Sequence, residues 1–559
     1  MHQIPIPKSI ASWNVLRKAT PHRALHKDDI LREIFERLST VGNASLAGEE
    51  RALCQRTLAI SARVCKDFLD PALDVLWREL ADFLDLMKII LPSAKTTTRG
   101  PHNIKVETLS GELTPEHAAR FFQYARRVRS IPNGIIRPET LLDPPSVYSY
   151  LADQNHGAPL LPQLQELRWQ ITSAAAATTL ITLVPKSLRR LRLDFQDSRF
   201  NENANIDSDQ TAQKDAIHSF LRTLRSKTPS LAYLVISGYV KSTAESWLPV
   251  AEFTRLQSLH IVITDPTLLP HIAQMPCLSE LSMSLFLPED DELRFGDCPF
   301  PALRDVTIQV TGNSLAYYTR ILGAVTSAHM ESVYMSVNFD GRPQSPGGAA
   351  LVEQYHGLYR VLGSTPSAPS LRKVQLDIWL HCNMGGVPEN RATLVAEQPL
   401  IEIFGPLLSS RTLEVLRFVQ YPCCPLPVIL SDGDIRQVAE AWPNLQSLLL
   451  RYKTSRSLPT IHVLADIARL CPNLEHLFLP GINTSETPDL SGNWQSSSPL
   501  RELYLIDGGG DADADRFARI LDRCFPFLDI SSLLYRDRSS TWLKIVGTLS
   551  RLQRTRNPE

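Results

Sequence analysis

The sequence predicts an α/β protein in which a short helical head is followed by a long solenoid, with parallel strands on one side and helices on the other. Three observations support this prediction: short amphipathic helical patterns within residues 24–98, an apolar pattern that recurs twelve times after them, and a helical pattern ahead of several copies. At 559 residues the chain is long enough for several domains. Stacked repeats remove that need, because each repeat shares its core with its neighbours.

The first predicted element is a head of three short helices. Apolar side chains at spacings of four place Ile30, Ile34 and Leu38 on one face of the first helix. The second helix is expected over residues 58–68, and the third includes residues 73–77. A unit of this size buries only about 60% of its unfolded surface, so we expect a neighbour or a partner to stabilise it.

An ordered set of residues runs through the head: Leu25, Ile30, Ile34, Phe35, Leu38, Val64, Cys65, Lys66, Leu76 and Trp77. On these residues the head resembles an F-box, the adaptor-binding module of cullin-type ubiquitin ligases. It is most similar to the F-box proteins of mushroom-forming (basidiomycete) fungi, which often carry Val-Cys-Lys, Pro-Ala-Leu and Leu-Trp-Arg motifs. The chain departs from the family at His26, where proline is usual, at Phe68, where tryptophan is usual, and in an insertion near residues 39–56.

The resemblance implies that the head docks the adaptor subunit of an SCF-type ubiquitin ligase, and through it a cullin, while the rest of the chain binds a protein substrate. The residues expected to contact the adaptor are Leu25, Ile30, Ile34, Leu58, Val64 and Trp77. The alternative is that the three helices only seal the end of the repeats, since terminal repeats need a cap. The protein would then be a leucine-rich-repeat scaffold or interaction protein.

The repeat is the pattern Leu-x-x-Leu-x-Leu with apolar substitutions. Its copies begin at Leu164, Leu188, Leu231, Leu256, Leu278, Leu303, Met330, Leu371, Leu413, Leu445, Leu474 and Leu500. Eight of the eleven intervals are 22–32 residues long, near the leucine-rich-repeat period of about 20 to 29 residues. The last two apolar positions alternate with one other residue, which is typical of a strand with one buried face. The sequence therefore predicts an irregular leucine-rich-repeat solenoid over residues 99–559.

Helical patterns precede the strands at residues 217–224, 435–442 and 461–470, and each is followed by a proline, which stops further winding. The first six copies lack Asn three residues after the last apolar position, so no asparagine ladder is expected. Polar or Pro/Gly-rich loops are expected near 196–213, 339–350 and 482–499. The alternative fold is ordinary α/β alternation around one open sheet.

In a strand of this kind, the residue between the two buried positions faces the hollow side of the solenoid. Arg and aromatic side chains are favoured there as binding hot spots. The predicted substrate-binding residues are Arg168, Arg192, His260, Tyr334, Arg417, Phe478 and Tyr504. Nothing in the sequence identifies the substrate.

Charge and composition give no support for a nucleic-acid or membrane partner. The net charge is −1, and no run approaches 18 apolar residues. The basic run Arg126-Arg127-Val128-Arg129 is interpreted as a solvated face. The nine cysteines form no C-x-x-C pair, which argues against a disulfide frame and a zinc site. We expect a cytoplasmic or nuclear protein with a disordered leader at residues 1–23.

Catalytic motifs are missing from the sequence. Asp511, Asp513 and Asp515 imitate the start of a calcium loop, but Arg516 occupies the position that needs glycine. These aspartates are therefore expected to cap a helix. We predict a binding protein rather than an enzyme, with no catalytic residue, metal or cofactor.

Overall fold

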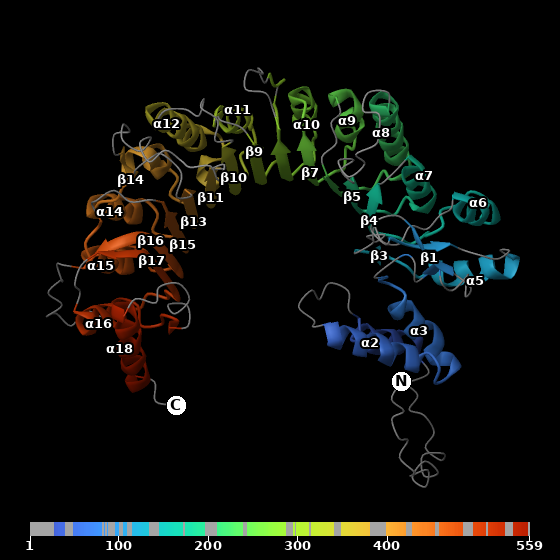
Figure 1. Cartoon of the computed structure of the whole chain (residues 1–559), viewed down its shortest axis with the longest axis horizontal. Coiled ribbons are helices and arrows are strands. Elements are labelled where there is room, and N and C mark those ends of the chain that lie inside the picture. Colours follow the sequence, from blue (N-terminus) through green and yellow to red (C-terminus); the bar gives the residue numbers. More distant parts are fainter. Residues whose placement is uncertain are drawn as a thin grey trace, which may run out of the picture. The chain divides into compact units, whose positions relative to one another are not determined.

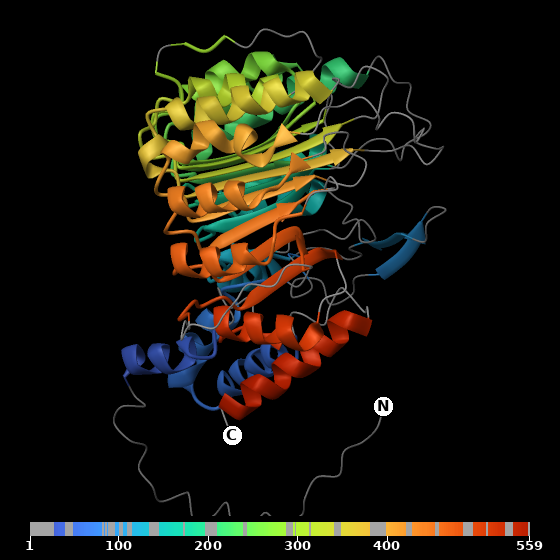
Figure 2. The same cartoon turned by 90° about the vertical axis from the view of Figure 1, so that its left-hand side faces the viewer.

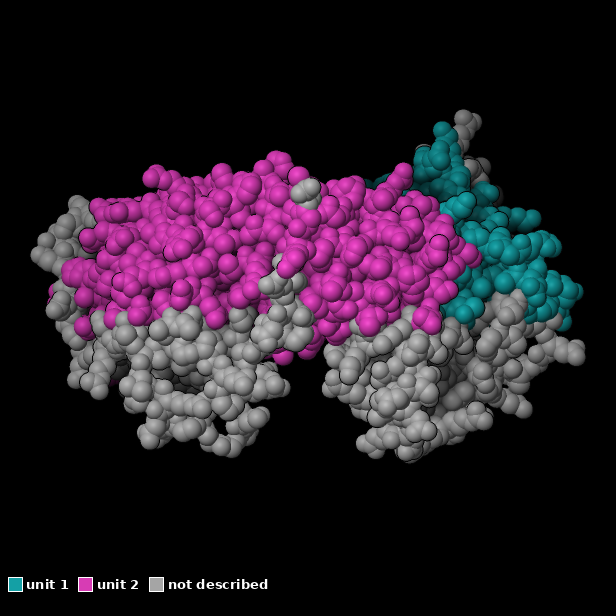
Figure 3. Space-filling model, turned by 90° about the horizontal axis from the view of Figure 1, so that it is seen from above, with its two compact units in different colours: residues 1–192 teal, residues 193–559 magenta. Residues whose placement is uncertain are grey.

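A computed structural model shows the arrangement of helices and strands (Figure 1). It describes residues 27–39, 48–80, 83, 86–87, 95–99, 104–108, 114–132, 145–171, 174–195, 209–238, 243–286, 294–296, 298–311, 315–339, 348–380, 398–420, 428–452, 458–484, 496–509, 513–530 and 540–556. The chain divides into two compact units, Met1–Arg192 and Leu193–Glu559, which Figure 3 shows in different colours. The division does not coincide with the boundary expected at residue 99.

Thirteen of the described strands belong to one long sheet, and their order in the sheet follows their order in the sequence, with β3 at one edge and β17 at the other. Each of the twelve predicted copies corresponds to one of these strands, β4 to β11, β13 and β15 to β17. The order never reverses, as it would in a doubly wound sheet. The structure therefore confirms the predicted solenoid rather than an open α/β sheet.

The first unit contains the head and the first repeats. The head consists of α1 (Asp28–Glu36), α2 (Gly48–Ser61) and α3 (Lys66–Leu76). The elements that follow are β1 (Lys95–Arg99), β2 (Ile104–Thr108), α5 (Pro115–Ala125), β3 (Ser130–Ile131), α6 (Pro145–Gln154), β4 (Glu166–Ile171), α7 (Ala174–Leu183) and β5 (Arg190–Phe195), whose last residues belong to the second unit. Strands β1 and β2 form a separate antiparallel pair.

The head has its own hydrophobic core, built from all three helices. Its buried members are Leu31 and Phe35 of α1, Leu58 of α2, Ala62, and Ala72 and Val75 of α3. Phe35 packs edge to face on Phe68, with ring centroids 5.5 Å apart. The three-helix prediction is confirmed, but the second helix, expected over residues 58–68, lies at Gly48–Ser61. On α1, Leu31 and Phe35 point inward, whereas Ile30 and Ile34, which are expected to contact the adaptor, do not.

The second unit repeats helix, turn and strand. Its helices are α8 (Asp209–Lys227), α9 (Ala244–Ala251), α10 (Leu269–Ala273), α11 (Ala316–Ala324), α12 (Gly348–Ser364), α13 (Leu400–Phe404), α14 (Asp432–Ala441), α15 (His462–Leu470), α16 (Ala514–Cys524) and α18 (Ser540–Arg556). Short 3-10 helices occupy Pro266–Leu268, Ala368–Ser370 and Gly405–Ser409. Strands β12 (Gln398–Pro399) and β14 (Val428–Ile429) form a separate parallel pair.

The sheet strands of this unit are β6 (Tyr233–Ser237), β7 (Ser258–Ile263), β8 (Glu280–Leu285), β9 (Asp305–Thr311), β10 (Ser332–Phe339), β11 (Lys373–Leu380), β13 (Val415–Gln420), β15 (Ser447–Arg451), β16 (His476–Asn483) and β17 (Glu502–Gly509). In Figure 1 the helices of the unit lie along one side of these strands. The alternate apolar residues of each strand, such as Leu259, Ile261 and Ile263 of β7, are buried. The other face of the sheet, here called the open face, carries no helix of the unit in Figure 1.

Helix ends match the sequence chemistry. The helices α8, α14 and α15 end one residue before Thr228, Trp442 and Cys471, and each of these residues precedes a proline. Asp513 caps α16, as predicted, by accepting the backbone N–H groups of Asp515 and Arg516 at 3.1 and 3.3 Å. Figure 2 shows α16 and α18 side by side at the C-terminal end of the unit.

Successive repeats are joined by shared backbone carbonyls rather than by an asparagine ladder. The carbonyl of Gln257 accepts the N–H groups of Ser279 and Glu280, at 2.8 and 2.9 Å. The carbonyl of Ser279 in turn accepts two N–H groups of the next repeat, and the pattern continues to Glu475, which accepts from Arg501 and Glu502. Because the bonds involve only main-chain atoms, any residue except proline, which has no backbone N–H, can donate at these positions.

The leader at residues 1–23 and Leu25 lie outside the described residues. So does most of each predicted loop, namely residues 196–208, 340–347 and 485–495, as well as Asp511. The insertion predicted near 39–56 contains a helix in its second half, because α2 begins at Gly48.

Candidate interaction surfaces

Six large apolar side chains of the head are exposed although the head has a core of its own. Their exposed fractions are 37% for Ile30, 45% for Ile34, 62% for Leu53, 60% for Ile60, 64% for Val64 and 41% for Leu69. They come from all three helices and from the turn between α2 and α3. A concentration of apolar side chains outside a satisfied core is typical of a surface that binds another protein.

Helix α2 shows most directly that a second apolar face is present. Leu58 points into the head and is 2% exposed. Leu53 and Ile60 are seven residues apart, which places them on one common face, and Ile60 lies 200° around the helix from Leu58. Large apolar side chains that stay exposed on the side away from the core are candidates for contact with another protein. No described residue covers the face of Leu53 and Ile60.

The predicted adaptor-contact residues divide between surface and core. Ile30, Ile34 and Val64 are exposed, as a contact residue must be. Leu58 instead belongs to the core of the head, where it is buried in one cluster with residues of α1 and α3. Trp77 is half-buried, and its ring lies against Tyr124 of α5 with centroids 4.8 Å apart. Leu58 therefore supports the head from within, Trp77 packs on α5 outside the three helices, and Leu25 lies outside the described residues.

On the open face of the second unit, the residues between the two buried positions form one continuous row. Each member is paired with the next across the sheet, in the order Val235, His260, Ser282, Thr307, Tyr334, Gln375, Arg417, Leu449, Phe478 and Tyr504. At about 4.8 Å between strands, the ten members span roughly 43 Å. We call this set the central row.

Five predicted substrate residues, His260, Tyr334, Arg417, Phe478 and Tyr504, belong to the central row and are half-buried. Phe478 and Tyr504 stack, with ring centroids 5.6 Å apart and an interplanar angle of 28°. The other two predicted residues, Arg168 and Arg192, occupy the equivalent positions of β4 and β5 in the first unit, where Arg168 is half-buried and Arg192 is exposed.

A polar network crosses the middle of the open face. Asp377 on β11 is 3% exposed and accepts two hydrogen bonds from Arg417, at 2.7 and 3.1 Å, and one from the hydroxyl of Tyr334, at 3.1 Å. Burial and the neighbouring Asp377 carboxylate raise the pKa of Tyr334, so its hydroxyl stays protonated and donates. The network holds the side chains of β10, β11 and β13 in one arrangement.

Two members of this surface were missed at the sequence level. Leu449 lies between Arg417 and Phe478 in the central row and extends the aromatic pair into a three-residue apolar stretch. Its position between two buried leucines could have identified it. Asp377 follows the second buried position instead, and only the three-dimensional pairing with Arg417 reveals its role.

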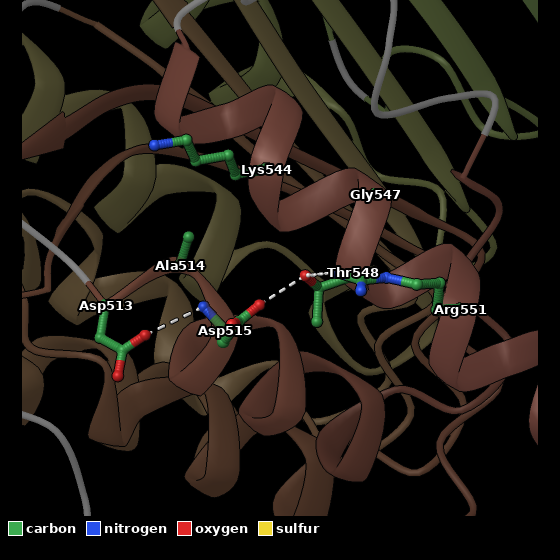
Figure 4. Close-up of a pocket in the computed structure, with 7 residues that line it drawn as sticks. All are labelled: Asp513, Ala514, Asp515, Lys544, Gly547, Thr548 and Arg551. Carbon is green, nitrogen blue, oxygen red and sulfur yellow. Dashed lines mark hydrogen bonds between the residues drawn. The ribbon is translucent and has the colours of Figure 1, made fainter.

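A shallow hollow of about 380 Å³ lies between α16 and α18 (Figure 4). Its lining residues are Asp513, Ala514, Asp515, Lys544, Gly547, Thr548 and Arg551. Asp513 caps α16, and Asp515 accepts a hydrogen bond of 2.6 Å from Thr548, which also accepts one from Arg551 at 2.9 Å. These polar groups connect the two helices, so we assign the hollow a structural role.

Within the described ranges, no three His, Cys, Asp or Glu side chains are placed to hold a metal ion together. In the same part of the chain, no helix combines the length and the apolar character needed to cross a membrane.

The fold and these surfaces define a leucine-rich-repeat solenoid with a helical head. No family model and no curated protein matches the chain. Among solved structures, it is similar to an internalin from Listeria monocytogenes (12% identity, 72% of this chain and 82% of the other, TM-score 0.28). It is also similar to a chain in the complex of Rad7 and Elc1 from yeast (14% identity, 69% and 81%, TM-score 0.28). TM-scores this low do not establish a shared function.

Proposed function

We propose that this protein is the substrate-recognition subunit of an SCF-type ubiquitin ligase, in which the head docks the adaptor and the repeats bind a protein substrate. The observation that carries the proposal is the set of six exposed apolar side chains on the head, Ile30, Ile34, Leu53, Ile60, Val64 and Leu69. The F-box-like order of residues in the same segment supports it. The protein itself catalyses no reaction; it raises the effective concentration of substrate near the ligase.

The second candidate is a leucine-rich-repeat scaffold whose head is only an end cap. One observation favours it: the segment after α3 forms the first rung of the repeats, because the carbonyl of Arg78 accepts the N–H groups of Arg129 and Ser130. An end cap, however, needs a polar outer surface for solubility. Leu53, Ile60 and Val64, each at least 60% exposed, do not meet that requirement.

The test is retention of the purified SCF adaptor by the full-length chain. Ile34→Asp combined with Val64→Asp places two charges on the exposed surface of the head without altering its core. The matched control is Leu543→Asp combined with Phe527→Asp, because these residues are 49% and 64% exposed in the second unit. We expect the head variant to lose at least tenfold in adaptor retention and the control to lose none.

Circular dichroism of both double variants shows whether the fold is kept. Equal retention by the head variant and the wild type contradicts the proposal, as does failure of the wild-type chain to retain the adaptor. If the wild-type chain is monomeric and stable but does not retain the adaptor, the end-cap scaffold is favoured.

A further inference from the structure

The basic run that follows α5 contains a buried guanidinium. The side chain of Arg127 is only 4% exposed. Its Nη1 donates to the carboxylate of Asp74 and to the backbone carbonyl of Asp70, the latter at 3.2 Å, and its Nη2 donates to the carboxylate of Asp70. The expectation of a solvated basic face is therefore wrong for this residue, because the run lies where α5 meets α3.

The same carboxylate reaches the first helix of the head. Asp74 accepts a hydrogen bond of 2.6 Å from Arg32 on α1 as well as the bond from Arg127. Arg32 also binds Asp28 at 2.6 Å. Asp74 thus links α1 and α3 of the head to Arg127, which lies between α5 and the first sheet strand, β3.

Two residues after Arg127, the backbone of the repeats joins the backbone of the head. The N–H groups of Arg129 and Ser130 donate to the carbonyl of Arg78, at 2.8 and 2.9 Å, and the N–H of Leu80 donates to the carbonyl of Ser130 at 3.0 Å. This is the shared-carbonyl arrangement that connects later repeats. The ion pairs of Arg127 lie directly beside this first rung.

Removing Arg127 and neutralising its two aspartate partners are expected to differ in energetic cost. A guanidinium taken out of water is costly unless charged partners compensate it, and here two carboxylates do so. The carboxylates are less buried, since the side chains of Asp70 and Asp74 are 63% and 27% exposed. Water can therefore solvate both aspartates if the arginine is removed, whereas the arginine has no comparable access if the aspartates are neutralised.

We propose that Arg127 is a positioning residue that locks the head onto the first repeats, so that the three helices of the head and residues 114–132 move as one body instead of as a head on a flexible linker. The lock follows from the contacts around Arg127, Asp70 and Asp74. Its consequence for the ligase, a defined direction of the docked adaptor relative to the first repeats, rests on the proposed function.

The experiment measures amide hydrogen exchange in the full-length chain without adaptor. Arg127→Met keeps most of the side-chain length and removes the charge. The matched control is Arg126→Met, because Arg126 is the neighbouring residue and is exposed. We expect the amides of Leu80, Arg129 and Ser130 to exchange at least tenfold faster in the first variant and within twofold of wild type in the control.

Two further variants separate positioning from folding. Asp70→Asn with Asp74→Asn leaves the buried cation uncompensated, so it should accelerate exchange at Arg129 and Ser130 more than Arg127→Met does. Arg127→Lys keeps the charge without the two-nitrogen fork and should fall between wild type and Arg127→Met. In all three, the amides that lie in the core of α3 should keep their protection.

Equal exchange at Arg129 and Ser130 in the Arg127→Met and Arg126→Met proteins overturns the proposal. A parallel acceleration throughout α1, α2 and α3 in both Arg127→Met and Arg127→Lys also overturns it, because Arg127 would then support folding of the head itself. Adaptor retention by the same variants is measured separately. If the wild-type chain does not bind the adaptor, the proposed function is contradicted. The exchange result, and with it the role of Arg127, is not affected by that outcome.

Discussion

Arg417 on β13 binds Asp377 on β11 through two hydrogen bonds of 2.7 and 3.1 Å, across the middle of the open face. Asp377 is 3% exposed and the Arg417 side chain 33%. Removing one partner of such a pair leaves a buried charge without compensation, although Tyr334 still donates to this carboxylate. The pair therefore stabilises the surface on which the substrate is proposed to bind.

We expect Arg417→Met to lower the free energy of unfolding by about 2 kcal/mol, because Asp377 loses its charged partner. Urea unfolding of the full-length chain measures this. The control is Arg372→Met, which breaks a 2.7 Å pair with Glu414 in which the arginine is 56% exposed. An exposed pair contributes less than about 1 kcal/mol, so equal effects of the two substitutions would contradict the assigned role of Arg417.

The stacked pair Phe478 and Tyr504 is expected to be a binding hot spot. Phe478→Ala with Tyr504→Ala should reduce retention of the substrate at least tenfold, because truncation of hot-spot aromatics typically costs 2 kcal/mol or more in binding. The measurement is quantitative mass spectrometry of proteins retained from native lysate by immobilised wild-type and variant chains.

The matched control for this pair is Val235→Ala, at the far end of the central row. The substrate is identified as a protein that is retained by the wild type and by the control but not by the double variant. Identical sets of retained proteins from all three chains would show that these aromatic residues play no part in binding.

The repeats could be predicted from the sequence because the apolar spacing within each strand is enough to identify it. The spacing of Leu256, Leu259 and Ile261 alone gives the buried face, and therefore also the exposed position of His260. Strand β3 was not predicted, because Val128 and Ile131 supply only two of the three apolar positions of the repeat pattern. The role of Arg127 could not be predicted from the sequence, because its partners Asp70 and Asp74 are more than fifty residues away in the chain.

The head was harder to divide into core and surface. Helix α2 carries large apolar residues on both sides, so spacing cannot tell Leu58 from Ile60. On α1 the neighbouring pairs Ile30/Leu31 and Ile34/Phe35 have the same periodicity. Only the packing of the three helices decides between them. The small size of the unit and the F-box-like order of its residues, rather than the phase of its apolar positions, were the sequence evidence for a partner.

The assignment of Leu58 to the core of the head and of Ile34 to its surface can be measured. Leu58→Ala should destabilise the head by about 3 kcal/mol, as expected for a leucine removed from a packed core. Ile34→Ala, at a residue 45% exposed, should change its stability by no more than about 0.5 kcal/mol. Native-state hydrogen exchange of the α3 amides reports the free energy of opening the head separately from the repeats. Equal effects would show that Ile34 is also a core residue.

Asp305 on β9 gives a prediction for pH. Although Asp305 is exposed, partial desolvation of its carboxyl, followed by repulsion from Glu280 and Glu331, raises the pKa of this carboxyl, with Lys373 and Arg304 partly opposing the rise. The folded state therefore binds this proton more tightly than the unfolded state does. Stability contributed by the protonated carboxyl is present at low pH and is lost as the pH rises through the interval between the unfolded value, about 3.9, and the raised folded value.

Asp305→Asn removes the ionisation, so the variant should have a higher melting temperature than the wild type at pH 7, and the difference should shrink as the pH falls towards 4. Differential scanning calorimetry across this range measures the difference. Asp153→Asn is the control, because Asp153 is also an exposed aspartate but lies on the helix α6 instead of on a strand beside Glu280 and Glu331. A wild type that melts higher than the Asp305→Asn variant at pH 7 would show that Lys373 and Arg304 outweigh Glu280 and Glu331 at this position.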